Sequence, residues 1–137
     1  MIAKEKFQLT ERILAAEAQT LQAYTKELCK PLPILSQDAT ILLTGGTATT
    51  LAALEQQLSN YEINAIDGYP MQHSTIQALY NQLNQMSLEQ RTTLPGMEPG
   101  RADIILPALL ILLTLLNVLN IHTVQISVRG ARYGILL

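Results

Sequence analysis

The sequence has little that would suit a secreted or a nucleic-acid-binding protein. It contains one cysteine, Cys29, which cannot form a disulfide within the chain, and residues 1–6 lack the apolar run of a secretory signal. Charged residues make up only 15% and the net charge is −2, which argues against disorder and against a basic surface for nucleic acid. Aromatic residues make up 4%, with no tryptophan, so a platform for stacking bases is missing. We therefore expect a cytoplasmic protein that binds no nucleic acid.

Apolar residues are what the sequence has in abundance. They make up 48% of its 137 residues, and a chain of this length can bury the core of one domain, expected to span residues 1–137. Residues 104–121 carry no formal charge, and an early proline, two late asparagines and the lack of a flanking Lys/Arg cluster favour a buried helix over a membrane span. We expect this helix to begin at Arg101 or Ala102, which keeps Pro107 near its first turn.

Three other segments carry apolar residues at the spacing of an amphipathic helix. The first spans residues 10–30. The second carries apolar residues over 51–58 and follows two glycines, with Thr47 or Thr49 as its N-cap. The third spans residues 76–86.

Two local motifs separate the third of these helices from the long apolar segment. Residues 87–90 read Ser-Leu-Glu-Gln and resemble a capping box that opens a short helix. Residues 94–100 contain two prolines and two glycines, which predict a loop.

Residues 39–44 and 123–128 are rich in β-branched and aliphatic residues and predict strands. The first run is bounded by turn residues, as a strand buried on both faces would be, and the second alternates with a period of two. Residues 61–70 are expected to hold a short extended segment that ends at the Asp67-Gly68 turn. With helices between them, the two strands are expected to pair in parallel through a right-handed crossover, which indicates an α/β fold.

The turn over residues 44–50, Thr-Gly-Gly-Thr-Ala-Thr-Thr, has the features of a phosphate site. Gly45 and Gly46 let a ligand approach the backbone, and the N–H groups at the positive end of the following helix attract an anion. The hydroxyls of Thr47 and Thr49 can add donors. Because the turn fits neither common phosphate-binding glycine motif, a capped tight turn without a ligand is the other interpretation.

Residues 94–105 and 127–136, taken in order with the glycine turn, resemble the Ppx/GppA phosphatase family of exopolyphosphatases and guanosine pentaphosphate phosphohydrolases. The resemblance implies an actin-like ATPase architecture, in which two ribonuclease-H-like domains enclose a cleft for polyphosphate or a nucleotide. This chain resembles the later part of the second domain. The expected fold is therefore α/β, a partial ribonuclease-H-like domain with a short, mostly parallel sheet and several helices.

The family places its catalytic glutamate and an Asp-Ile-Gly-Gly-Gly-Ser phosphate loop upstream of the portion that this chain resembles. No residue of this sequence matches either motif. Gly45, Gly46 and Thr47 match the family's Gly-Gly-Thr turn and are expected to bind phosphate. Arg101 and Asp103 match its Arg-Ala-Asp sequence at the head of the long helix.

Arg129 and Arg132 match the family's terminal Arg-Gly-x-Arg block. In this sequence Ala131 and Tyr133 stand where leucine and glutamate are commoner, which removes the acidic residue from the block. Arginines at a strand end either attract an anionic ligand or form structural ion pairs with carboxylates such as Asp103, and both interpretations stay open.

The sequence shows no catalytic set and no metal site, because its acids are isolated and its histidines lack paired ligand spacing. The residues concerned are Asp38, Asp67, Glu98, Asp103, His73 and His122. The resemblance implies magnesium only for an intact enzyme. We expect a fragment that binds phosphate, polyphosphate or a guanosine phosphate at most and does not catalyse hydrolysis alone. The alternative is a non-catalytic module that self-associates, so the expected partner is the missing upstream half or a second copy in a homodimer.

Overall fold

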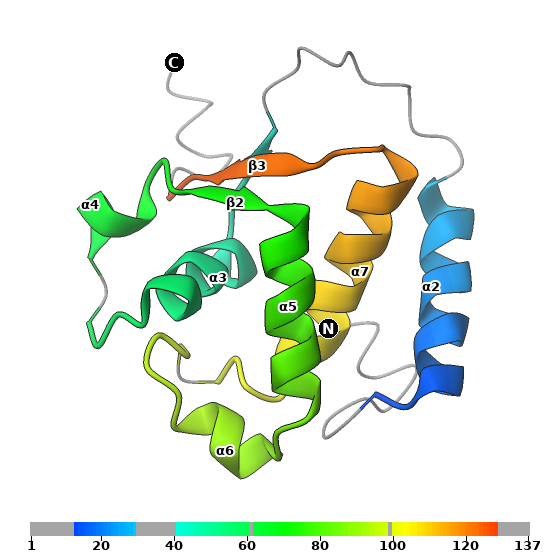
Figure 1. Ribbon diagram of the computed structural model, residues 1–137, viewed down its shortest axis with the longest axis horizontal. Coiled ribbons are helices and arrows are strands. Elements are labelled where there is room, and N and C mark those ends of the chain that lie inside the picture. Colours follow the sequence, from blue (N-terminus) through cyan, green and yellow to red (C-terminus); the bar gives the residue numbers. More distant parts are fainter. Residues whose placement is uncertain (1–12, 30–40, 61, 99, 129–137) are drawn as a thin grey trace.

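The computed structural model describes residues 13–29, 41–60, 62–98 and 100–128. The elements follow one another in the order shown in Figure 1: α2 (Ala15–Cys29), β1 (Leu42–Leu43), α3 (Gly46–Gln56), α4 (Ile63–Ile66), β2 (Pro70–Gln72), α5 (His73–Asn84), α6 (Leu88–Thr92), α7 (Ile105–Val118) and β3 (Thr123–Ile126).

The three strands form one mixed sheet in the order β1-β3-β2. β1 pairs with β3 in parallel, with Leu42 opposite Gln125, which confirms the parallel pairing expected between the two strands and the α/β class. β2 pairs with β3 in antiparallel orientation, with Met71 opposite Val124. The expectation of a mostly parallel sheet is therefore wrong, because it did not include this three-residue strand.

The segment before β2 also differs from the expectation. Residues 61–70 were expected to be extended up to the Asp67-Gly68 turn, but α4 occupies this stretch and the strand follows the turn. The turn is held by β3: the Gly68 N–H donates to the Ile126 carbonyl at 2.7 Å, and the Val128 N–H donates to the Asp67 carboxylate at 3.1 Å. These bonds fix the entry of the chain into β2.

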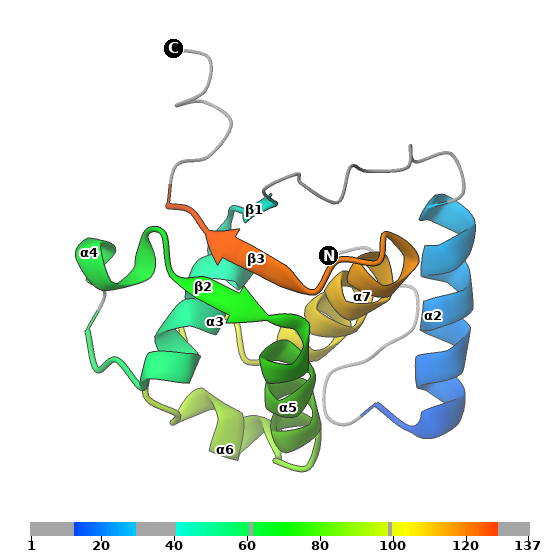
Figure 2. The same ribbon diagram turned by 45° about the horizontal axis from the view of Figure 1, so that its top comes forward.

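The helices α3, α5 and α7 pack on one face of the sheet, as Figure 2 shows. The strand residues on that face, Met71, Val124 and Ile126, are buried. Leu42 alternates to the opposite face and is 58% exposed, so the expectation of a first strand buried on both faces is wrong. Within the described residues, the sheet is covered by helices on one face only.

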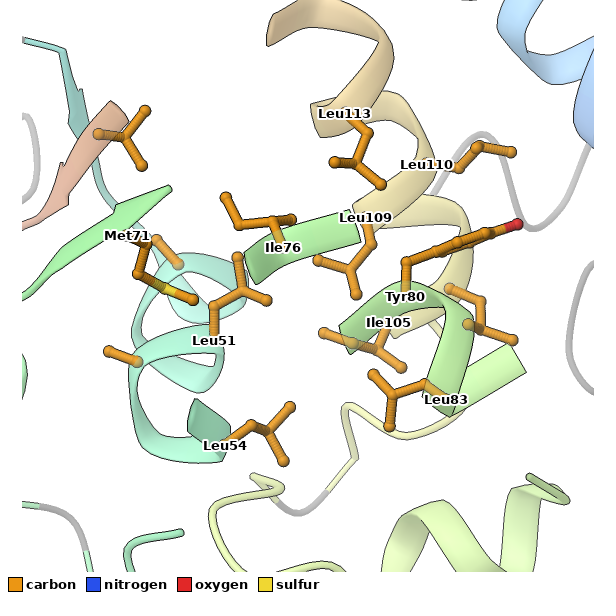
Figure 3. Packing of buried hydrophobic residues seen from close by; sticks show 14 of the residues in the cluster. Leu51, Leu54, Met71, Ile76, Tyr80, Leu83, Ile105, Leu109, Leu110 and Leu113 are labelled. Atoms are coloured by element: carbon orange, nitrogen blue, oxygen red, sulfur yellow. The ribbon is translucent and has the colours of Figure 1, made fainter. Parts of the chain in front are cut away.

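Helix α7 lies at the centre of the helical layer, between α2 and α5 (Figure 1). Its side chains belong to one core cluster with those of α3, α5 and β2. Figure 3 shows Leu109 of α7 facing Ile76 of α5, and Met71 of β2 beside Leu51 of α3. The apolar composition of residues 104–121 is thus explained by burial. In the part of the chain that the structure describes, no helix is long and apolar enough to cross a membrane.

The ends of α7 are set by local geometry. The helix begins at Ile105 rather than at Arg101 or Ala102, because residues 101–104 form a turn in which the Arg101 carbonyl accepts from the N–H groups of Ile104 and Ile105. The helix ends where Asn120 takes a positive φ of 56°, so that the Ile121 N–H reaches back to the Leu116 carbonyl.

The remaining helices follow the expected spacing with one difference. In α2, Leu21 and Thr25 are buried while Leu28 is 60% exposed, so the buried stripe is narrower than the run of apolar residues suggests. The capping box is confirmed: the Gln90 N–H donates to the Ser87 hydroxyl at 3.1 Å, and the Ser87 N–H donates to the Gln90 side chain at 2.9 Å.

Candidate functional site

The glycine turn that links β1 to α3 is the best candidate for a functional site. Gly45 is the N-cap residue of α3 and has a φ of 97°, a backbone conformation that residues other than glycine rarely adopt. Among the described residues, no side chain caps the helix. The hydroxyl of Thr49 instead donates to the carbonyls of Gly45 and Gly46 at 3.3 and 3.2 Å, so the expectation that Thr47 or Thr49 caps the helix is wrong.

The uncapped start of α3 leaves backbone donors available. The N–H groups of the first turn of a helix have no partner inside the helix, and those of Gly46 and Thr47 belong to this turn. The helix dipole adds a partial positive charge at the same end, and no acidic residue lies in the first turn to offset it. This end of α3 therefore favours an anion.

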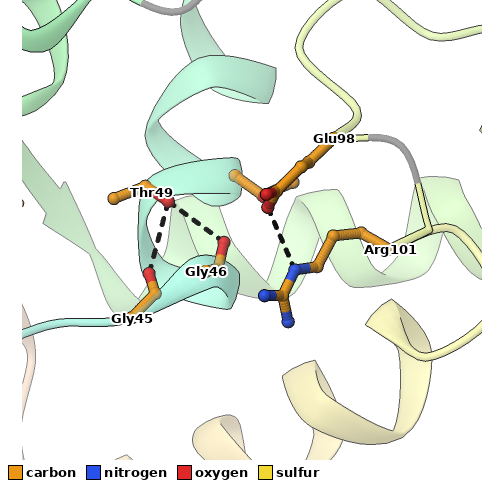
Figure 4. Close-up of polar contacts among 6 residues, drawn as sticks. Gly45, Gly46, Thr49, Glu98 and Arg101 are labelled. Carbon is orange, nitrogen blue, oxygen red and sulfur yellow. Dashed lines mark hydrogen bonds and ion pairs between the residues drawn. The ribbon is translucent and has the colours of Figure 1, made fainter.

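Arg101 reaches the same place from the turn that precedes α7. A Cβ added to Gly46 would collide with the guanidinium group of Arg101, so the guanidinium lies directly against the first residue of α3. Figure 4 shows this approach. Glycine is thus needed at position 46 for the close approach of a side chain, whereas Gly45 is needed for its backbone conformation.

Glu98 neutralises part of this positive charge. Its carboxylate pairs with the Arg101 side chain at 3.1 Å (Figure 4). It also accepts a longer hydrogen bond, 3.4 Å, from the buried hydroxyl of Thr50. The Arg101 and Glu98 side chains are 29% and 51% exposed, so solvent screens the ion pair, and it contributes at most about 1 kcal/mol. An anion with several charged oxygens can therefore displace Glu98 from Arg101 at small cost.

The structure shows less about the other site residues proposed from the sequence. Asp103 lies half-buried in the turn between Arg101 and α7. Arg129 and Arg132, with the rest of the terminal block, lie outside the described residues. The structure therefore joins Gly45, Gly46, Thr47 and Arg101 at one end of α3.

Sequence reasoning missed the roles of Glu98 and Thr50. The sequence pattern predicts an isolated loop acid at Glu98, although Glu98 stands three residues before Arg101, a spacing at which an ion pair forms within one turn. The contact between Thr50 and Glu98 depends on how the loop folds over α3, and no sequence spacing signals it.

The site does not fit a magnesium ion held by the protein. No group of three or more His, Cys, Asp or Glu side chains comes together in the part of the chain that is described. The carboxylate beside the turn, Glu98, already binds Arg101 and Thr50, whereas magnesium requires several oxygen ligands. We assign no magnesium ligand to these residues.

Comparisons with known proteins place the chain in one protein family. The model of the Ppx/GppA phosphatase family matches residues 2–137, and the match corresponds to the C-terminal portion of the family. Exopolyphosphatase 2 of Mycobacterium tuberculosis is 34% identical in an alignment over 107 residues that covers 71% of this chain and 33% of that protein.

Solved structures give the same result for the fold. The Ppx/GppA family member of Aquifex aeolicus is 27% identical, with a TM-score of 0.87 over 98% of this chain and 44% of that one. An exopolyphosphatase from Cytophaga hutchinsonii is 18% identical and shares the fold, with a TM-score of 0.76 over 96% of this chain and 44% of that one. The actin-like fold expected from the sequence is confirmed. The chain spans about a third of the curated relative and less than half of the solved ones.

Proposed function

We propose, because this chain belongs to the Ppx/GppA phosphatase family, that it forms one wall of a binding site for the phosphate chain of polyphosphate or of a guanosine pentaphosphate. The observation that carries the proposal is the position of the Arg101 guanidinium against Gly46, at the uncapped and positive end of α3. The names of the relatives give the substrate class, since Exopolyphosphatase 2 of Mycobacterium tuberculosis is among them.

The chemistry of the site suits a phosphate group. The N–H groups of Gly46 and Thr47 can donate to one phosphate oxygen, and the Thr47 hydroxyl adds a third donor. Arg101 supplies a full positive charge and the planar pair of donors that matches two phosphate oxygens. A phosphate chain bound here replaces the carboxylate of Glu98 as the partner of Arg101.

Hydrolysis requires chemical groups that this wall of the binding site does not supply. Breaking a phosphoanhydride bond needs a group that orients the attacking water and cations that stabilise the developing charge. The described residues offer Arg101 as a cation, but the one carboxylate beside it is engaged by Arg101 and Thr50. We therefore assign binding to the matched portion and propose that the catalytic groups lie in the part of the relatives that is outside the match.

A calorimetric titration of short-chain polyphosphate into the chain, in metal-free buffer, tests the proposal. The variant Gly46→Asp is expected to lose binding, because its carboxylate repels phosphate and displaces Arg101. The variant stays folded, since an acidic residue in the first turn of a helix is stabilising by about 0.3–1 kcal/mol. Circular dichroism checks the fold.

The variant Ser59→Asp is the matched control, because it adds the same charge at an exposed position beyond the other end of α3. It is expected to bind like the wild-type chain. Equal loss in both variants would mean that net charge, rather than the glycine turn, governs binding. Unchanged binding in Gly46→Asp would show that the glycine turn is not part of the binding site.

A further inference from the structure

A cavity lies where the loop that precedes Arg101 meets the C-terminal end of α3. It has a volume of about 170 Å³. Its walls come from α3 and the residues that follow it, among them Ala53, Ser59 and Asn60, and from Gly96, Met97 and Glu98 of the loop. A cavity of about 150 Å³ holds benzene, so this one has room for about six non-hydrogen atoms.

Backbone contacts hold the walls of this cavity in place. A Cβ added to Gly96 would lie 2.5 Å from the carbonyl oxygen of Ala53, so the loop touches α3 there without a gap. The Met97 N–H donates to the Leu94 carbonyl at 3.1 Å, and the Leu58 N–H donates to the Ala53 carbonyl at 3.0 Å. The cavity is therefore formed before any ligand enters it.

The surroundings of the cavity favour a cation. Among the described residues that line it, only Glu98 carries a charge. The C-terminal end of α3 adds a negative partial charge, and the last turn has no basic residue to offset it. Glu55 in this turn and Glu62 after it are exposed acids. The hydroxyl of Ser59 and the amide oxygen of Asn60 supply neutral acceptors.

Glu98 has an oxygen atom to offer to such a cation. Its two bonds to described residues, from Arg101 at 3.1 Å and from Thr50 at 3.4 Å, both end on Oε2. Oε1 can accept from a further donor. Because the Glu98 side chain is 51% exposed, it can turn toward a second partner at small cost.

We propose that this cavity is a binding site for a primary alkylammonium ion of about six non-hydrogen atoms. The three N–H groups of the ammonium match the acceptors of Glu98, Ser59 and Asn60, and the alkyl chain packs on Leu58 and Met97. A divalent metal ion fits less well, because in the described part of the chain no three His, Cys, Asp or Glu side chains come together.

Glu98 also links this cavity to the phosphate site. An ammonium ion that pairs with Glu98 weakens its hold on Arg101, so a phosphate chain meets less competition for the guanidinium. The ion is expected to tighten polyphosphate binding by up to about fivefold, and polyphosphate tightens ammonium binding by the same factor. This coupling rests on the proposed function, whereas the ammonium site itself does not.

A titration of pentylammonium chloride at constant ionic strength tests the site, with nuclear magnetic resonance on the isotopically labelled full chain as the readout. The amide signals of Asn60, Met97 and Glu98 are expected to shift and to saturate at about millimolar concentration. 1-Pentanol has the same number of non-hydrogen atoms and no charge, and it is expected to bind at least about fivefold more weakly. Equal binding of both compounds, or shifts that do not saturate, would overturn the proposal.

Two pairs of variants locate the ammonium group. Glu98→Gln is expected to weaken pentylammonium binding by about tenfold. Its control is Glu17→Gln, which removes a charge from α2 and keeps an acceptor for the Leu14 N–H. Ser59→Asp adds a carboxylate to the cavity wall and is expected to tighten binding by about threefold, whereas Val118→Asp, at an exposed position on α7, should change it by less than about 1.5-fold. Equal effects within either pair would overturn the proposal in favour of a general effect of charge.

Calorimetric titration of tripolyphosphate, with and without saturating pentylammonium, tests the coupling. The wild-type chain is expected to bind up to about fivefold more tightly with pentylammonium, and Glu98→Gln is expected to show no change. The variant also corrects for ammonium that pairs with tripolyphosphate in solution. An equal gain in both chains would refute the coupling. A chain that binds pentylammonium but not tripolyphosphate would refute the proposed function and the coupling, and the ammonium site would stand.

Discussion

Arg101→Gln is expected to weaken the binding of polyphosphate by about 10- to 100-fold while the chain stays folded. Hydrogen bonds to a charged group contribute about 1.5–3 kcal/mol, and each 1.4 kcal/mol corresponds to about a factor of ten. The loss of the ion pair with Glu98 costs little stability, because both side chains are partly exposed and the pair contributes at most about 1 kcal/mol. Calorimetric titration measures the affinity, and thermal unfolding measures the stability.

Glu98→Gln is expected to have the opposite effect on the affinity for polyphosphate. Without its charge, residue 98 competes less well with phosphate for Arg101, and binding is expected to tighten by roughly two- to fivefold. Thr50 can still donate its hydrogen bond to the amide oxygen of the glutamine, so the loop keeps its anchor to α3. If Glu98→Gln and Arg101→Gln both weaken binding to the same degree, the pair supports the loop structurally and does not compete with a ligand.

Gly96→Ala is expected to lower the free energy of unfolding by about 2–5 kcal/mol. Gly96 has a φ of 94°, and a Cβ there would lie 2.5 Å from the carbonyl oxygen of Ala53 and 2.8 Å from the backbone nitrogen of Leu54. These are backbone atoms of α3, which cannot move aside as the end of a flexible side chain can. The loop that carries Glu98 would have to separate from the helix. Urea denaturation measures the change.

The variant Gly100→Ala separates the two contributions to this loss. Gly100 also has a positive φ, 83°, but a Cβ added there would meet nothing within 4 Å. Its substitution is expected to cost only the backbone strain, about 1–2 kcal/mol. An equal loss for both variants would show that the close approach of the loop to α3 at Gly96 is unimportant.

Much of the fold could be predicted from the sequence because strong local patterns coincide with the final packing. The uncharged run in residues 104–121 became the central helix α7, and the Ser87 capping box formed as expected. β2 was missed because three residues are too few for a period. Its place is set by the hydrogen bonds that Gly68 donates to Ile126 in β3 and that His73 donates to His122, just before β3. Short strands of this kind are determined by tertiary contacts more than by their own sequence.

The candidate site could be predicted in part. Gly45 and Gly46 signal a turn by residue type alone, and the family resemblance indicated a role for Arg101. That the guanidinium of Arg101 lies against Gly46 could not be predicted, because the two residues are distant in sequence and meet only when the loop that carries Glu98 folds over α3. The binding of phosphate at this place stays a prediction.

Nuclear magnetic resonance tests the central claim, that a phosphate chain binds at the start of α3, most directly. Short-chain polyphosphate added to the isotopically labelled chain is expected to shift the amide signals of Gly46 and Thr47 and the side-chain signal of Arg101 more than any others. The amide of Gly68, whose hydrogen bond to Ile126 lies in the sheet, should not shift. Saturation of the shifts at Gly46 and Thr47 would establish the site. Unchanged signals at both residues, with polyphosphate in large excess, would contradict it.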